Sequence, residues 1–387
     1  MSENWVEVRL GDVAQAHKET VNPVKLGSSI VDHYSLPAFD NGKKPERVSA
    51  ESIKSNKLNV PPGAVLVSRL NPHIPRIWTP QVDPDTPSIC STEFAVLSPT
   101  ACEPEFLRYF VESDEIYGRL GESVNGTSSS HQRVSLDHLL DMRAPMPPAG
   151  EQQRIAEVLG ALDDRIESAA RLEKVLGEAV LAEYGVSLVD REVEESISLV
   201  DAVSLINGGA YTKGADDTGR MVIRIKELNS GPSESTVFSS ITVPDNKTAY
   251  PGDVLFAWSG SLGVWRWYRD EAIVNQHIFK VLPKKHPVWL GWIHILEELE
   301  RFQDIAAGKA TTMGHITKDH LERTMVPTFS PEELQALSAR VGPLWVAQLQ
   351  AGRELHTLQA VRAQLLPALV SGALRVAAAE GLVEAAT

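Results

Sequence analysis

The chain has 387 residues, of which 43% are hydrophobic and 23% charged, so it is long enough for two folded domains and is neither disordered nor collagen-like. Its 37 basic and 51 acidic side chains give a formal net charge of −14, which argues against coating nucleic acid or anionic membranes through bulk charge. Cys90 and Cys102 cannot form a disulfide framework or a structural zinc site, and no apolar leader or long apolar run occurs, so we expect a reduced, cytoplasmic protein that does not enter membranes.

The two halves of the chain are related in sequence. Four pairs of segments recur at offsets of 189, 189, 185 and 182: 8–13 with 197–202, 62–66 with 251–255, 94–97 with 279–282, and 137–139 with 319–321. Repeated matches at nearly one offset predict a duplicated domain in which short insertions fall in loops.

In chain order, each half begins with β-rich runs and closes with a helix. Pro-Gly turns precede the runs 64–68 and 254–258, which we predict to be strands in small mixed domains. A helix is expected to start near Pro147 in the first half. In the second half, Ser330, Pro331 and Glu333 occupy the N-cap, N1 and N3 positions, which predicts a capping box there.

Apolar residues recur at a spacing near 3.5 along both helices, which is typical of a coiled-coil seam. In the first helix they are Ile155, Val158, Leu162, Ile166, Ala169, Leu172, Leu176 and Val180. In the second they are Leu334, Leu337, Val341, Leu344, Ala351, Leu355, Leu358, Leu365 and Leu369, with Gln348 and Arg362 in the same register. Matched lengths favour pairing of the two helices, and packing of each on its own domain is the alternative. Gly342-Pro343 predicts a kink or a later regular start.

Two motifs carry a family resemblance. The segment PPAGEQQRIAEVL at 147–159 and the ending LLPALVSGALRV at 365–376, together with Trp5 and Leu10-Gly11-Asp12, resemble the DNA-recognition (specificity) subunit of type I restriction-modification enzymes over nearly the whole chain. SPEEL at 330–334 replaces the Pro-Pro-x-x-Glu-Gln motif in the second half, which weakens residue-level inferences about partner contacts there.

The resemblance implies an α+β fold in which two target-recognition domains, each reading half of a split DNA sequence, are separated by two long antiparallel helices. It predicts the first recognition domain at 1–149, the spacer helix and linker at 150–195, the second domain at 196–329 and the second spacer helix and tail at 330–387. It also implies two modification subunits that use S-adenosylmethionine to methylate adenine, and restriction subunits that use ATP and magnesium. We expect partner contacts at Glu151, Gln152, Arg154, Leu365 and Leu369.

The sequence lacks the motifs of an enzyme. Asn71-Pro72-His73-Ile74 departs from an adenine methyltransferase motif at its third and fourth positions, and there is no phosphate-binding loop, His-Glu-x-x-His or Gly-x-Ser-x-Gly motif. We therefore expect no catalysis, no metal and no cofactor in this chain itself.

Polar segments that could read base edges occur at matching places in both halves. One follows the Pro-Gly strand, and the other is a loop rich in hydroxyls, for which a solvated linker is the alternative. Basic residues near the start of the second domain suit phosphate, and an Arg pair in register could read guanine. The candidates are Arg69, Asn71, His73, Arg76, Ser128, Ser129, Ser130, His131, Arg133, Lys213, Arg220, Arg224, Lys226, Ser259, Lys309, Thr311, Thr312 and His315.

Two other functions stay open. The chain could direct a methyltransferase-based phage-defence system that lacks cleavage, or it could be a protein-binding scaffold that never touches DNA. For the tryptophans at 258–292, core packing is favoured over base stacking. For His138 and His320, a helix-capping or packing role is favoured over DNA contact.

Overall fold

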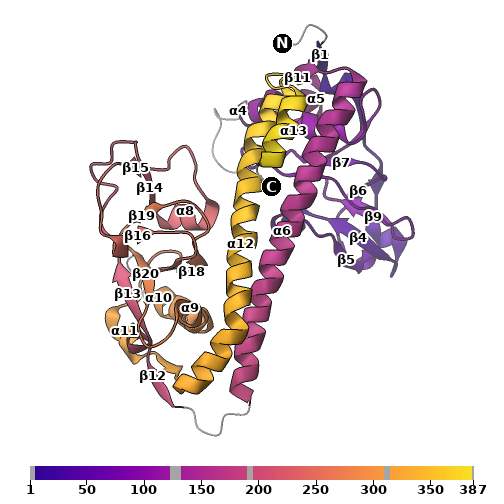
Figure 1. The fold of residues 1–387 in the computed structure, drawn as a ribbon. Coiled ribbons are helices and arrows are strands. Elements are labelled where there is room, and N and C mark those ends of the chain that lie inside the picture. The colour runs from indigo at the N-terminus through magenta and orange to yellow at the C-terminus, as the bar shows by residue number, and fades with distance from the viewer. Residues whose placement is uncertain (1–4, 123–131, 190–194, 309–313, 386–387) are drawn as a thin grey trace. The chain divides into compact units, whose positions relative to one another are not determined.

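The computed structural model describes residues 5–122, 132–189, 195–308 and 314–385 (Figure 1). The chain divides into two units, of which unit 1 combines residues 1–165 with 358–387 and unit 2 spans 166–357. Two long helices, α6 (Ala149–Val189) and α12 (Pro331–Val370), each contribute one part to unit 1 and the other part to unit 2. The predicted α+β class is confirmed, whereas the predicted boundaries of the recognition domains remain a prediction.

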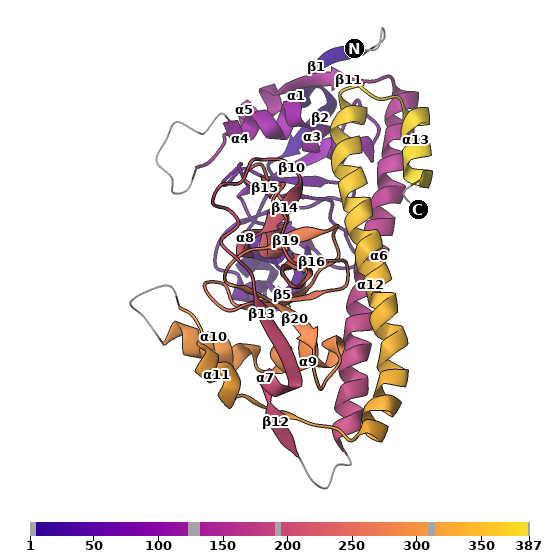
Figure 2. The same cartoon turned by 60° about the vertical axis from the view of Figure 1, so that its left-hand side comes forward.

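Unit 1 is built on two sheets, one with strand order β2-β10-β7-β8 and one with order β3-β6-β9-β4-β5, and a small pair β1-β11. The strands are β1 (Val6–Arg9), β2 (Ala14–His17), β3 (Thr20–Val21), β4 (Ile30–Tyr34), β5 (Glu46–Ser49), β6 (Lys57–Asn59), β7 (Val65–Ser68), β8 (Ile77–Trp78), β9 (Ser88–Cys90), β10 (Phe94–Pro99) and β11 (Arg143–Met146). The helices are α1 (Leu10–Val13), α2 (Leu36–Asp40), α3 (Phe106–Glu112), α4 (Arg119–Glu122), α5 (Leu136–Asp141) and α13 (Val376–Ala385), with short turns η1 (Pro23–Leu26), η2 (Ala50–Ser52) and η3 (Asp114–Gly118). Figures 1 and 2 both show α13 beside the ends of α6 and α12 that belong to this unit.

Unit 2 has the sheets β13-β20-β17-β18 and β15-β14-β19-β16 and the pair β12-β21. Its strands are β12 (Ser196–Ser198), β13 (Val203–Asn207), β14 (Arg220–Ile223), β15 (Phe238–Ser239), β16 (Thr248–Ala249), β17 (Val254–Ala257), β18 (Gly263–Arg266), β19 (Ala272–Val274), β20 (Ile278–Pro283) and β21 (Met325–Pro327). Its helices are α7 (Leu199–Ala202), α8 (Ile225–Ser230), α9 (Val288–Glu297), α10 (Leu299–Ala307) and α11 (Lys318–Arg323), with the turn η4 (Asp245–Lys247).

The strand pairing confirms the duplication and corrects one of its offsets. The order β2-β10-β7-β8 in unit 1 equals β13-β20-β17-β18 in unit 2, and β1-β11 equals β12-β21. Ser68 pairs with Phe94, and its counterpart Ala257 pairs with Ile278, so β10 and β20 correspond at an offset of 184. The offset of 185 read from the FAVL and FKVL segments was therefore wrong by one residue. A one-residue slip exchanges the two faces of a strand, and the structure accordingly buries Phe94 and Ile278 fully.

The predicted helix start at Ser330 is confirmed. The Ser330 backbone N–H donates to Glu333 Oε2 at 2.7 Å, and the Glu333 N–H donates to Ser330 Oγ at 3.2 Å, so both halves of the capping box form. At the other helix, Gln152 is buried near the start and its side chain donates to the Pro147 carbonyl at 2.8 Å. The helix α12 continues through Gly342 and Pro343, so the predicted later start does not occur.

Loss of the cap at Ser330 should destabilise unit 2. We expect Ser330→Ala to lower the free energy of unfolding by about 1 kcal/mol, because the Glu333 N–H loses its acceptor. Urea titration followed by far-UV circular dichroism measures this change. Ser330→Thr, which keeps the hydroxyl, serves as the control, and equal effects of the two substitutions would contradict the capping role.

The predicted apolar seam between α6 and α12 is confirmed in both units, with one exception. Leu162 and Leu369 are fully buried in unit 1, and Val180 and Val341 are fully buried in unit 2. Leu172 is instead 51% exposed. In unit 2, contacts run from Glu173 to Gln348 and from Glu183 to Arg340, so numbers rise on one helix as they fall on the other and the helices are antiparallel.

A polar layer interrupts the seam in unit 1. Arg362 of α12 forms an ion pair with Asp163 of α6 and donates to Glu112 of α3 at 2.7 Å. Asp163 also accepts from the Tyr109 hydroxyl at 3.0 Å and pairs with Arg108 at 2.9 Å. Arg362, the polar residue in the predicted seam, therefore connects the two long helices to the globular part of unit 1.

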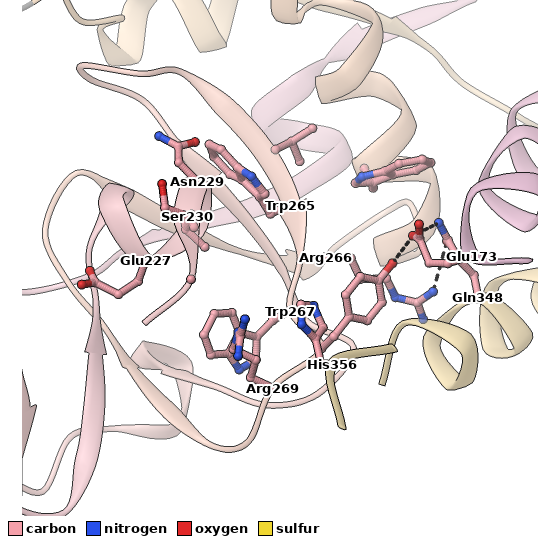
Figure 3. A pocket seen from close by; sticks show the side chains of 15 residues that line it. Glu173, Glu227, Asn229, Ser230, Trp265, Arg266, Trp267, Arg269, Gln348 and His356 are labelled. Atoms are coloured by element: carbon pink, nitrogen blue, oxygen red, sulfur yellow. Dashed lines mark hydrogen bonds between the residues drawn. The ribbon is translucent and has the colours of Figure 1, made fainter. Parts of the chain in front are cut away.

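A second polar layer lies in unit 2 (Figure 3). Gln348, buried in the seam, donates to Glu173 at 3.0 Å, and the same carboxylate accepts from the Tyr268 hydroxyl at 2.6 Å. Arg266 donates to the Gln348 side chain at 3.3 Å and stacks on Trp345 at 3.7 Å. Because Glu173 occupies the seam at this level, Leu172 on the neighbouring face is left exposed.

Candidate nucleic-acid interface

In unit 1 the structure brings the two predicted polar segments together. Leu70, just after β7, forms a β-bridge with Arg133, which follows the hydroxyl-rich loop. The Asn71 N–H donates to the Gln132 carbonyl at 2.8 Å, and the Val134 N–H donates to the Arg69 carbonyl at 2.9 Å. Residues more than sixty positions apart therefore form one polar tip, which we call tip 1 and define as residues 69–76 with 132–134.

Unit 2 repeats this arrangement. Ser259 forms a β-bridge with His315, the Gly260 N–H donates to the Gly314 carbonyl at 3.0 Å, and the Ile316 N–H donates to the Trp258 carbonyl at 3.1 Å. Tip 2, defined as residues 258–261 with 314–316, therefore matches tip 1 at the offsets of 189 and 182 found in the sequence.

Both tips turn through a left-handed residue at the matching position. Asn71 has φ 49° and its counterpart Gly260 has φ 65°. Only glycine adopts this conformation freely, and asparagine is among the few side chains that tolerate it, which explains the residue types at this turn. The equivalence of the tips thus extends to their backbone conformation.

In tip 1, some of the predicted DNA-binding residues are exposed to solvent, and others are held in contacts within the protein. His73 is exposed and Asn71 half-buried. Arg76 donates to both oxygens of Asp40, at 2.7 and 2.8 Å, and this holds the pKa of Asp40 below its ordinary value. Ser128, Ser129, Ser130 and His131 lie outside the described residues.

Arg69 and Arg133 converge on one backbone carbonyl. Their guanidinium groups donate to the Thr92 oxygen at 2.9 and 3.1 Å. Arg133 also pairs with Glu93 at 3.3 Å. Burial lowers the pKa of Arg69, and repulsion from Arg133 adds to that lowering.

In unit 2 the predicted basic residues are mostly paired. Arg220 pairs with Glu271 and donates to the Ile241 carbonyl, while Arg224 pairs with Glu227 and donates to the Ser235 carbonyl. Neither arginine keeps a free planar fork, so reading of guanine by this pair requires those contacts to break. Lys226 donates to the Ser235 hydroxyl at 2.6 Å, and Lys213 is exposed.

The remaining candidates of unit 2 either belong to tip 2 or lie outside the described residues. Ser259 is buried, which removes its hydroxyl from the surface, and His315 is half-buried with its ring 6.4 Å from that of Trp258. Lys309, Thr311 and Thr312 lie outside the described residues. His320 accepts the Thr317 N–H at 3.1 Å at the start of α11, which confirms its predicted capping role.

Lys18 is a basic residue beside tip 1 that the sequence did not single out. It follows β2, whose antiparallel pairing with β10 brings it to the same cavity as Arg69 and Arg133. The cavity has a volume of about 160 Å³. Its position depends on strand pairing, so no local sequence signal could have revealed it. A larger cavity of about 470 Å³ lies in unit 2 beside Tyr268 and Gln348, but none of the predicted DNA-binding residues lines it (Figure 3).

The predicted partner-contact residues are divided between surface and interior. Arg154 is exposed, and half-buried Glu151 accepts from the Trp5 indole at 3.1 Å. Gln152, Leu365 and Leu369 are buried inside unit 1. Contacts with a partner at these three positions would have to act through their neighbours, and the interface remains a prediction.

Comparison with known proteins decides the family. Residues 2–177 match the family described as the type I restriction modification DNA specificity domain. The chain carries a type I restriction-modification DNA specificity domain. The family predicted from the sequence is thereby confirmed for residues 2–177, and tip 1 lies within this DNA specificity domain. No curated protein matches the chain.

Solved structures extend the comparison of fold beyond the matched domain. The S subunit of the type I restriction-modification system from M. genitalium superposes with a TM-score of 0.61 at 14% identity, covering 95% of this chain and 96% of that one. The HsdS subunit from Thermoanaerobacter tengcongensis has 21% identity, a TM-score of 0.42 and coverage of 97% and 98%. A structure described for complex assembly and conformational transition of the type I R-M system has 22% identity, a TM-score of 0.44 and coverage of 97% and 99%. The first likeness shows that the S-subunit fold spans nearly the whole chain.

Within the described residues, no helix combines the length and apolar character required to cross a membrane.

Proposed function

We propose that this chain reads a bipartite DNA target, with one half-site for each repeat, as the specificity subunit of a type I restriction-modification complex. The observation that carries the proposal is the duplicated tip, in which the same bridge and the same left-handed turn place polar segments together in each unit. Two similar readers in one chain fit a target that has two separate parts. The chain itself performs no chemistry in this proposal.

The proposed partners supply the chemistry. Two modification subunits hold S-adenosylmethionine and methylate adenine, and restriction subunits hold ATP and magnesium and cleave the DNA. The segment 150–195 has 12 acidic and 5 basic residues, so the chain alone should bind DNA weakly and in a salt-sensitive way. Partner subunits would then provide much of the surface that neutralises phosphate.

Selection of random oligonucleotides by the assembled complex tests this function. The chain is co-expressed with the methyltransferase subunit encoded beside it, and the expected result is an enriched motif of two fixed halves separated by a gap of constant length. Methylome sequencing of the same cells should show methylated adenine in that motif. Selection of no motif would contradict the proposal and favour the protein-binding scaffold, and methylation without cleavage would favour a defence system that lacks restriction subunits.

In this proposal the helix pair sets the length of the gap. Duplicating one heptad in each helix, 165–171 in α6 and 355–361 in α12, keeps the seam register and adds about 10 Å to each helix. We expect both half-sites to stay unchanged while the gap grows by about three base pairs, since base pairs are spaced about 3.4 Å apart. The selected motif measures this directly.

Duplication of the heptad in α6 alone is the matched control. It leaves the two helices unequal, so the expected result is loss of binding rather than a longer gap. An unchanged gap with both heptads duplicated would exclude the spacer role while leaving the reading of two half-sites intact.

A further inference from the structure

All the charged side chains that line the cavity beside tip 1 are cationic. Its lining includes Lys18, Arg69 and Arg133, together with His17 and Thr92, and no acidic residue. Glu93 pairs with Arg133 from outside the lining, so three cations face one carboxylate. In the described residues, Lys18 forms no ion pair, which leaves an uncompensated positive charge at the cavity.

The donors of this cavity suit an anion better than a base edge. Arg69 gives one guanidinium nitrogen to the Thr92 carbonyl, and its Nε is buried without a partner in the described residues. Arg133 gives one nitrogen to the same carbonyl and directs Nε at Glu93. Reading of guanine needs a free planar fork, which neither arginine offers, whereas a phosphate needs converging positive charge.

The residues described at the equivalent place in unit 2 are mostly aromatic and include neither lysine nor arginine. At the corresponding offsets, Lys18 is replaced by Asn207, Arg69 by Trp258 and Arg133 by His315. The Trp258 indole donates to Asn207 at 2.9 Å, and its ring lies 5.0 Å from that of His277. One architecture therefore carries a cationic cavity in the first repeat and, among the described residues, an aromatic cluster in the second.

We propose that the cavity formed by Lys18, Arg69 and Arg133 is a phosphate site that clamps the DNA backbone beside the first half-site, and that the matching residues Asn207, Trp258 and His315 of the second repeat form no such clamp. This inference rests on the proposed function, because it names a contact made during DNA reading. The clamp fixes the position of tip 1 on the duplex and carries no sequence information of its own. Affinity for the first half-site should accordingly depend more steeply on salt than affinity for the second.

Salt titration of DNA binding tests the clamp. The Lys18→Gln variant is compared with the wild type, each as the full chain assembled with its modification subunits. Fluorescence anisotropy measures binding to the selected duplex and to a scrambled duplex from 50 to 300 mM salt. Removal of one phosphate contact should reduce the slope of log K against log salt by about 0.9 and weaken both duplexes equally. The loss of affinity between 50 and 200 mM should then be about threefold smaller than in the wild type.

Three further variants separate the effect of charge from an effect on the fold. Lys25→Gln removes an exposed lysine of the same unit that does not line the cavity, and it should leave the slope unchanged. Arg69→Gln should lower the slope, whereas Arg69→Lys, which keeps the charge, should preserve it.

The outcomes distinguish the clamp from the proposed function. An unchanged slope in Lys18→Gln with an intact selected motif would overturn the clamp alone, as would an effect confined to one base position. Weaker association with the modification subunits, with the salt slope preserved, would assign the cavity to an acidic protein surface and also overturn it. Failure of the wild-type complex to select any motif would overturn the proposed function instead.

Discussion

Replacement of Arg362 by methionine is expected to lower the free energy of unfolding of unit 1 by about 2–4 kcal/mol. The substitution leaves Asp163 and Glu112 close together, with Arg108 paired to both of them and Lys43 near enough to interact with them electrostatically. The Arg362, Asp163 and Glu112 side chains are 21%, 19% and 15% exposed, so water screens the remaining repulsion only in part. Removal of one partner from such a cluster costs more than an exposed ion pair contributes.

Urea denaturation gives the change in stability, and hydrogen exchange of the α3 amides reports the loss locally. Arg353→Met, at an exposed position on the same helix, is the control and should change stability by less than about 0.5 kcal/mol. Asp163→Leu combined with Arg362→Met should recover part of the loss, because the pair is then replaced by apolar packing. Equal effects of Arg362→Met and Arg353→Met would show that the polar layer contributes no stability.

The architecture was largely predictable from sequence because it is encoded by periodic and repeated signals. The seam spacing, the Ser330 capping box and the recurring Pro-Gly strands each rest on short-range patterns. The same patterns placed Gln348 and Arg362 in the seam, although not their partners. Glu173, Tyr268 and Glu112 reach these residues through tertiary packing, which has no local signature.

The candidate interface was predictable only in outline. Repetition marked the segments that form both tips, but it did not reveal which side chains are free. Arg76 and Arg224 resemble exposed DNA-binding residues in the sequence, yet both are neutralised by acidic neighbours, Asp40 36 positions away and Glu227 three positions away. Lys18 is the reverse case. Nothing in the local sequence marks it as a DNA-binding residue, and only the pairing of β2 with β10 brings it to the cavity. The off-by-one match at β10 arose because two Phe residues aligned by identity rather than by pairing partner.

A buried histidine pair makes unit 2 sensitive to acid. His286 Nδ1 and His294 Nε2 are 3.1 Å apart, and both rings are almost fully buried against Tyr184 and Phe329. Burial lowers the pKa of His286 to about 4 and that of His294 to about 3, with repulsion from Lys285 and between the two rings adding to the effect. The remaining nitrogens, His286 Nε2 and His294 Nδ1, have no partner among the described residues, so nothing stabilises a charged ring.

The native pKa of both histidines lies below the ordinary value near 6.5, so the unfolded chain binds more protons than the folded one once the pH falls below 6.5. Stability of unit 2 should therefore be constant above pH 7 and fall as the pH drops to 4, by roughly 3 kcal/mol for each histidine, at 1.36 kcal/mol for each pKa unit. Urea midpoints followed by tryptophan fluorescence measure this, since six of the eight tryptophans belong to unit 2. In the double variant His286→Leu/His294→Leu, the decline in stability should be several kcal/mol smaller. The decline that remains comes from the carboxylates and from His356, because burial also lowers the pKa of His356 to about 4. As the control, His73→Gln changes an exposed histidine of unit 1 and should retain the full decline in stability. A double variant as acid-sensitive as the wild type would show that the histidine pair titrates without an effect on folding.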